Sequence, residues 1–311
     1  VELTNIRNEL GLDAFWHERN SLRMIDKIEL LQDNNKNYQN LNLTYAVRDG
    51  IISHCGEVDE NGIKPRKEKI DLDTFKISGQ YQAYTWEGCV VKIADKIAYL
   101  GRDIEDAIRM EFIEDSDIKK LMEISRTYGV KTINTTVIIH NFITSICANS
   151  TPESGIRLSD EHNEMLNSIK KFNYETIYMN PKFNVYRNYA ALIIRSIYDT
   201  LMESYDSTDG VNTIYRLLKR KKSYPQLKNF VKHLLIYSDT PSEIYNDVYS
   251  RLYPDTCQDE TLEGRLKEEY KNRRIYGLFE TELIYAQAII DYISGMTDRY
   301  AIEIFNELIR Y

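Results

Sequence analysis

The stretch from residue 88 to residue 106 combines side chains capable of chemistry with the pattern of a helix. Its apolar residues recur at helical intervals: Val90, Val91, Ile93, Ala94, Ile97, Ala98 and Ile104. Its polar residues also follow a 3.6-residue period and therefore share one face: Lys92, Asp95, Tyr99, Arg102 and Asp103, with Lys96 at the border. Two carboxylates, a phenol and a guanidinium thus stand in line among apolar residues.

Two interpretations of this polar face are open. Polar helix faces are commonly solvated and carry pairs of opposite charges four residues apart. Alternatively, polar groups set among apolar residues are costly unless they meet partners. On that interpretation the face binds a ligand that carries a metal ion, phosphate and hydroxyl groups.

Length and composition predict a helical fold with a substantial core. The chain has 311 residues, of which 42% are hydrophobic. Only 13 Gly and 6 Pro occur, which favours long uninterrupted helices over a turn-rich β fold. We expect an all-α protein, built as one large domain or as two fused helical lobes.

Charge and cysteine usage limit the class of protein further. A formal net charge of −8 argues against a broad nucleic-acid surface, yet an anionic substrate needs only local positive charge. The four cysteines are scattered without a Cys-x-x-Cys motif, which is typical of reduced thiols in a cytoplasmic protein. No run of 18 apolar residues occurs, so we expect no membrane span and no signal peptide.

Apolar periodicity and helix-start signals give the expected order of elements. Helices are expected at about 2–11, from His17 onward, 44–54, 87–113, 116–127, 130–149, 159–177, 187–205, 209–221, 225–237, 241–252, 260–276 and 279–310, the last broken near Gly295. Residues 34–42 are expected to form a polar loop, and residues 56–81 a long irregular segment.

Three segments, in order, resemble one known family. Asp-Lys-x-x-Tyr-x-x-Arg-Asp at 95–103, within EGCVVKIADKIAYLGRDIEDAI, resembles the closing motif of the HD-domain deoxynucleoside triphosphate triphosphohydrolases, the dGTPase-like family, in its bacterial branch. FWHERNSLR at 15–23 and DYISGMTDRYA at 291–301 resemble two further motifs of that family. LNLTYAVRDGIISHCGE at 41–57 lies where the family has a similar stretch, so the resemblance runs from about residue 10 to residue 305.

The resemblance implies a metal site and phosphate contacts. The family holds one divalent metal with two histidines and two aspartates, and Asp95 matches the last of these ligands. Lys96 matches a lysine that contacts the substrate phosphates, and Arg102 matches a recurrent arginine with a structural or phosphate-directed role. The implied cofactor is one Mn²⁺, Mg²⁺ or Fe²⁺ ion, since histidine and carboxylate ligands suit all three.

The resemblance also implies a sugar clamp and an acid–base residue. Tyr99 and Asp103 match residues that pack under the deoxyribose and bind it, Asp103 accepting a hydrogen bond from the 3′-hydroxyl. His17 matches a histidine that acts at the scissile phosphate ester, with Glu18 as its orienting neighbour. An imidazole with a pKa near neutrality is suited to moving that proton.

The chain departs from the family in one respect, because it contains no His-Asp dipeptide. The family's first three metal ligands come from upstream His…His-Asp motifs, so one expectation is that a segment of roughly a hundred residues precedes Val1. The alternative is a natural chain that lost the metal site and kept the scaffold. The persistence of His17, Asp95 and Asp103 favours the first alternative. Residues 1–150 would then form the C-terminal part of the HD catalytic core, and residues 151–311 a helical region packing on it.

The function implied is that of a metal-dependent dNTP triphosphohydrolase, with dGTP as one candidate substrate and an HD-type helical fold. It would hydrolyse a deoxynucleoside triphosphate to the deoxynucleoside and triphosphate, in the cytoplasm and as a homo-oligomer. Two alternatives are carried with it. One is a catalytically inactive HD-fold protein for nucleotide binding or oligomerisation, and the other is an HD phosphohydrolase acting on another nucleotide.

Overall fold

The computed structural model confirms the all-α class and divides the chain into two compact units. It describes the chain outside residues 57–60, 130–133, 222–223, 255–269, 272–273 and 310–311. Unit 1 comprises residues 1–43 and 189–311, and unit 2 comprises residues 44–188. The expected division of the HD core from a C-terminal region at residue 150 stays a prediction. Among the described residues, no helix has both the length and the apolarity to span a bilayer.

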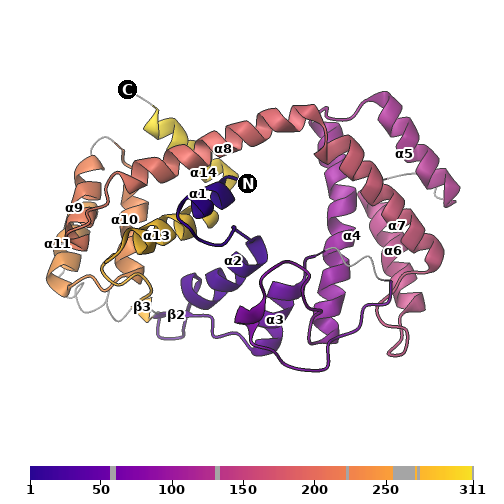
Figure 1. The fold of residues 1–311 in the computed structure, drawn as a ribbon, viewed down its shortest axis with the longest axis horizontal. Helices are drawn as coiled ribbons and strands as arrows, with labels where there is room; N and C mark the ends of the chain where they lie inside the picture. The colour runs from indigo at the N-terminus through magenta and orange to yellow at the C-terminus, as the bar shows by residue number, and fades with distance from the viewer. Residues whose placement is uncertain (57–60, 130–133, 222–223, 255–269, 272–273, 310–311) are drawn as a thin grey trace. The chain divides into compact units, whose positions relative to one another are not determined.

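Unit 2 is a set of helices around α4 (Trp86–Arg109). Its other elements are α3 (Tyr45–Ser53), the 3₁₀ turn η2 (Leu72–Thr74), α5 (Asp115–Thr127), α6 (Thr135–Asn149), α7 (Asp160–Asn173), the π-helical turn η3 (Tyr174–Tyr178) and the first residues of α8 (Pro181–Met202). Helix α4 packs against α3 on one side and against α6 and α7 on the other (Figure 1). The expected helices at 44–54, 87–113, 116–127 and 159–177 are therefore confirmed, the last continuing into the π-helical turn.

Local sequence signals explain where α4 begins and how closely α6 approaches it. The Thr85 hydroxyl accepts a hydrogen bond from the Gly88 amide at 3.1 Å and so caps the first turn. At Gly101 an added Cβ would lie 3.0 Å from the Cα of Thr135, the first residue of α6. The absence of a side chain at Gly101 therefore lets the two helices pack closely.

The buried face of α4 differs from the apolar frame expected from the sequence. Val90 and Val91 are 45% and 49% exposed, whereas Lys92 and Lys96 are 0% and 8% exposed. The buried residues in the second half of α4 are aliphatic or small: Ile97, Leu100, Gly101, Ile104 and Ala107. The helical period agrees with the expectation, but the elements that pack on α4 set the phase of its buried face.

The segment between α3 and α4 is tied to α3 by a buried ion pair. The guanidinium of Arg66 bonds to the carboxylate of Asp49, which is fully buried in α3. The other Asp49 oxygen accepts from the Tyr84 amide at 2.7 Å. Arg66 also donates to the Gln82 carbonyl at 2.6 Å. These bonds fix the chain just before α4 begins.

A crossing of two glycines in this segment supports a stability prediction for unit 2. Gly56 has a φ of +101°, and an added Cβ would lie 2.3 Å from the Cα of Gly79. We expect Gly56→Ala to cost more than about 2 kcal/mol, because the backbones must separate and an L side chain at positive φ adds strain. Gly129→Ala is the matched control, since its φ is +69° with nothing within 4 Å of the added Cβ; it should cost only about 1 kcal/mol. Urea denaturation measures the free energy of unfolding of both variants. An equal decrease in the two variants would contradict the close approach of Gly56 and Gly79.

Unit 1 encloses a second, larger core. Its elements are α1 (Glu2–Glu9), α2 (His17–Arg23), the π-helical turn η1 (Met24–Ile28), β1 (Leu30–Gln32), β2 (Tyr38–Asn40), the remainder of α8, α9 (Gly210–Arg220), α10 (Leu227–Tyr237), α11 (Ser242–Leu252), β3 (Tyr270–Lys271), α13 (Glu282–Ser294) and α14 (Asp298–Leu308). Buried side chains of α8, α10 and α13 fill the centre. The expected break near Gly295 is confirmed, because α13 ends at Ser294 and α14 begins at Asp298.

The polar loop expected at 34–42 is a hairpin. Strand β1 pairs with β2 in antiparallel fashion, and β2 pairs with β3 in parallel. The Asp33 carboxylate accepts from the amides of Asn35 and Asn37, and Lys36 takes a φ of +67°. The side chain of Asp33 thus closes the turn. Turns of this kind are rich in polar residues, which is why the composition of residues 34–42 resembles that of a loop. Most of the helix expected at 260–276 lies outside the described residues, and within it Tyr270–Lys271 form β3.

Candidate active site

Helix α4 presents the predicted site residues of unit 2 along one side. Asp95 is exposed, Tyr99 and Asp103 are half-buried, and Lys96 is almost fully buried. The ring of Tyr99 packs against the buried core of unit 2. Asp95 and Asp103 are eight residues apart, which is about 12 Å along a helix axis. One end of this face thus offers a solvent-accessible carboxylate and the other a carboxylate in a partly apolar setting.

The carboxylate of Asp103 has a specific partner, Tyr178. The phenol of Tyr178, at the end of the π-helical turn η3, donates a hydrogen bond to Asp103 Oδ2. Burial raises the pKa of Asp103 above its usual value, the hydrogen bond from Tyr178 opposes that rise, and the negative charge of Asp106 adds to it. The phenol therefore favours the ionised form of a carboxylate that burial would tend to protonate.

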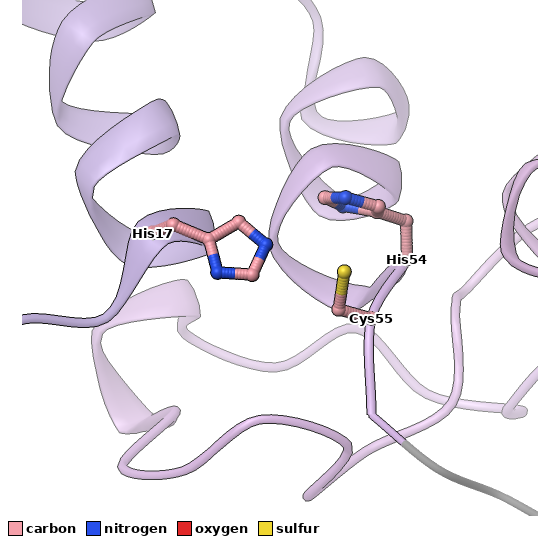
Figure 2. Close-up of side chains that lie close together, drawn as sticks. All are labelled: His17, His54 and Cys55. Atoms are coloured by element: carbon pink, nitrogen blue, oxygen red, sulfur yellow. The ribbon is translucent and has the colours of Figure 1, made fainter. Parts of the chain in front are cut away.

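A thiol lies close to Asp95 in unit 2, and an imidazole lies close to that thiol. Cys55 Sγ is 3.9 Å from Asp95 Oδ2. His54 and Cys55 follow the C-terminal end of α3, and their metal-binding atoms lie within 4.8 Å of one another (Figure 2). His54 Nδ1 is 2.6 Å from the Ile51 carbonyl oxygen, which can only accept, so Nδ1 carries the proton and Nε2 the lone pair. This is the tautomer in which a histidine can bind a metal through Nε2.

Arg102 lies on the solvated surface of α4, as the first of the two interpretations of the polar face predicts. Its side chain is 65% exposed and lies 3.4 Å from the carboxylate of Asp106, one turn further along α4. Such exposed pairs contribute little to stability. Lys92, by contrast, is fully buried and its Nζ lies 3.4 Å from Gln82 Oε1. The polar stripe of the sequence therefore combines a surface pair with buried or half-buried groups.

His17 and Glu18 stand together at the start of α2 in unit 1. His17 is the first residue of that helix (Figure 2) and is largely exposed, whereas Glu18 is fully buried. His17 Nδ1 lies 3.1 Å from Glu18 Oε2. At this distance the carboxylate can pair with the imidazole when the ring is protonated.

Sequence reasoning did not identify Tyr178 or Cys55 as neighbours of the predicted site. Tyr178 is 75 residues from Asp103 along the chain, and Cys55 is 40 residues from Asp95. Neither belongs to a spacing pattern that includes its partner. The one sequence signal near Cys55 was its place within the stretch at 41–57, which resembles the family.

Comparisons with known proteins agree on one family. Residues 219–307 match the phosphohydrolase-associated domain. The chain is similar to "Deoxyguanosinetriphosphate triphosphohydrolase-like protein" of Clostridium perfringens (strain SM101 / Type A), with 31% identity over 196 residues, covering 62% of this chain and 49% of that protein. The protein of the same name from Clostridium tetani (strain Massachusetts / E88) is 26% identical over 310 residues, covering 97% and 62%.

A third relative extends the similarity to another genus. The protein of that name from Listeria monocytogenes serovar 1/2a (strain ATCC BAA-679 / EGD-e) is 24% identical over 328 residues, covering 95% of this chain and 66% of the relative. The chain spans about half the length of the first of these relatives. With the motifs on α2, α4 and α13, these similarities support the resemblance to the dGTPase-like family of HD-domain phosphohydrolases.

Proposed function

We propose that the protein is a metal-dependent dNTP triphosphohydrolase. Water adds to the α-phosphorus, the bond from that phosphorus to the sugar 5′-oxygen breaks, and the 5′-oxygen takes up a proton, giving a deoxynucleoside and triphosphate. The observation that carries the proposal is the polar side of α4, where an exposed carboxylate and a half-buried one flank the ring of Tyr99. The names of the relatives support it, since they are dGTP triphosphohydrolase-like.

Asp95 is the residue of this chain that would hold the divalent metal, Mn²⁺, Mg²⁺ or Fe²⁺. Its carboxylate is exposed, and a thiol 3.9 Å away adds a second group of the kind that binds transition metals. The residues therefore fit a metal at this end of α4. The family's other three ligands have no matching His-Asp motif in these 311 residues. When bound, the metal would stabilise negative charge on the phosphoryl oxygens.

The family resemblance assigns roles to the other site residues, and their chemistry suits these roles. His17, whose Nδ1 lies 3.1 Å from Glu18 Oε2, would give a proton to the leaving 5′-oxygen. Lys96 and Arg102 supply positive charge on α4 for the phosphates. Tyr99 would pack under the deoxyribose, and Asp103 would accept from its 3′-hydroxyl, which gives a selectivity that an apolar pocket lacks.

Phosphorus NMR tests the proposal. The whole gene product is incubated with Mn²⁺ and a mixture of the four dNTPs. Appearance of tripolyphosphate, without pyrophosphate or orthophosphate, would establish cleavage at the α-phosphate ester. Nucleotide binding without any product would identify an inactive binding or assembly protein instead. Orthophosphate or pyrophosphate as the product would identify a phosphohydrolase of different specificity.

Acid pH provides a test of the role of Asp103. We expect the KM for a dNTP to rise as the pH falls, starting at a higher pH than an ordinary aspartate would cause, because burial raises the pKa of Asp103. A protonated carboxyl is a weaker acceptor for the 3′-hydroxyl, so the substrate binds less tightly. KM is measured between about pH 5 and pH 8. Asp103→Asn should show a raised KM without this acid limb, and an unchanged limb would contradict the assignment.

A further inference from the structure

A π-helical turn follows α7, and hydrogen bonds to other parts of unit 2 fix its position on both sides. The turn η3 spans Tyr174–Tyr178. Just before it, the buried Asn173 donates from Nδ2 to the Leu100 carbonyl of α4 at 3.1 Å. Just after it, Asn180 donates to the Phe112 carbonyl at 2.8 Å. π-Helical turns are rare and frequent at functional sites, so this one calls for a physical explanation.

The turn delivers one polar side chain to α4. Ile177 is buried in the core of unit 2, and the ring of Tyr178 packs beside the same core. The Tyr178 hydroxyl donates to Asp103 Oδ2, three residues beyond Leu100 on the same helix. The Tyr178 carbonyl in turn accepts from the Arg187 guanidinium at 3.1 Å. The phenol is therefore held from its backbone, from its ring and from its hydroxyl.

A phenol is a well-suited partner for a carboxylate that must accept a ligand hydroxyl. It donates a hydrogen bond without bringing a positive charge, so the carboxylate keeps its charge and its remaining lone pairs. Among the described residues, the bond from Tyr178 is the one hydrogen bond that the Asp103 side chain accepts. Oδ1 is thus left for a ligand. An arginine at this place could bond both oxygens and compete with the ligand.

We propose that Tyr178 is a positioning residue for the sugar subsite: it holds Asp103 through Oδ2 so that Oδ1 accepts from the 3′-hydroxyl of the nucleotide. The inference rests on the proposed function, since it names the side chain that holds Asp103 in the proposed sugar subsite. It adds that selection for a 3′-hydroxyl depends on a side chain from η3 as well as on α4.

The test compares two substrates in two variants of the whole gene product. Tyr178→Phe keeps the ring and removes the hydroxyl. We expect it to lower kcat/KM for a dNTP about 10-fold, the loss typical of a hydrogen bond to a charged group. It should change kcat/KM for the 2′,3′-dideoxy analogue, which lacks the 3′-hydroxyl, less than about 3-fold. A merely structural role would lower both values by the same factor.

Tyr128→Phe is the matched control. Its hydroxyl bonds to Ser168 Oγ at 3.3 Å in the same unit, away from Asp103. We expect this variant to keep the wild-type ratio of kcat/KM for the two substrates. If Tyr178→Phe also keeps that ratio while the wild type hydrolyses dNTPs, the inference is overturned and the proposed function stands.

A binding measurement separates the two proposals when turnover is lacking. Calorimetry gives the Kd of a deoxynucleoside and of its 3′-deoxy analogue. The ratio of these two Kd values measures discrimination for the 3′-hydroxyl without turnover. If the wild type discriminates between these ligands and Tyr178→Phe does so about 10-fold less, the inference holds even though hydrolysis fails. If neither hydrolysis nor 3′-hydroxyl discrimination is found in the wild type, both proposals are overturned.

Discussion

Replacing Asp95 with alanine in the whole gene product is expected to abolish turnover and to lower metal content without unfolding the protein. Asp95 is exposed on α4 and forms no part of either buried core, so its loss leaves the packing of the helix intact. Loss of a metal ligand should lower kcat by a factor of about 10³ or more, since transition-state charge then lacks its counter-ion.

Activity, bound metal and helicity are measured on the same preparation. Turnover is followed by release of triphosphate, metal by elemental analysis after dialysis, and folding by circular dichroism. Glu123→Ala is the charge-matched control, because it removes an exposed carboxylate from α5 of the same unit. It should retain wild-type turnover and metal. A wild-type rate in Asp95→Ala would show that α4 does not carry the metal site.

The largest stability effect is expected at Asp291, in α13 of unit 1. Its side chain is fully buried and accepts three hydrogen bonds from Arg23, at 2.7, 2.8 and 3.0 Å. Tyr276 and Gln287 each donate a further bond at 2.8 Å. Burial, and then the charge of Asp291, raise the pKa of Tyr276 well above its usual value, so the phenol stays a neutral donor. One carboxylate thus satisfies three surrounding side chains.

We expect Asp291→Ala to destabilise unit 1 by about 3–5 kcal/mol, because it leaves the largely buried guanidinium of Arg23 without its counter-charge. Urea denaturation monitored by circular dichroism measures the change. Glu303→Gln, which breaks the exposed pair of Arg299 and Glu303 in α14, is the control and should leave the denaturation midpoint unchanged. A midpoint for Asp291→Ala that equals the wild-type midpoint would show that the buried pair contributes nothing.

The ion pair between Arg23 and Asp291 gives a structural role to two of the segments that resemble family motifs. The stretch DYISGMTDRYA begins at Asp291, and FWHERNSLR ends at Arg23. The two motifs meet in this ion pair, 268 residues apart in sequence. Part of what makes these motifs recognisable is therefore the internal support of unit 1.

The sequence by itself determined most of the helices, the family resemblance and the order of polar residues along α4. These features depend on neighbours within a few residues: apolar period, caps such as Thr85, and the spacing of Asp95, Tyr99 and Asp103. Local rules of this kind can be applied without knowing what a helix packs against. The hairpin at β1 and β2 shows their limit, since its closing turn has the composition of a loop.

Only the tertiary structure decided which face of α4 is buried and which distant groups meet it. Lys96 is buried and Val91 is exposed, because the helices that pack on α4 set the phase of its buried face. The bond from Tyr178 to Asp103 joins residues 75 positions apart. Such a contact leaves no period in the sequence, because its geometry depends on how α7, its π-helical turn and α4 pack together.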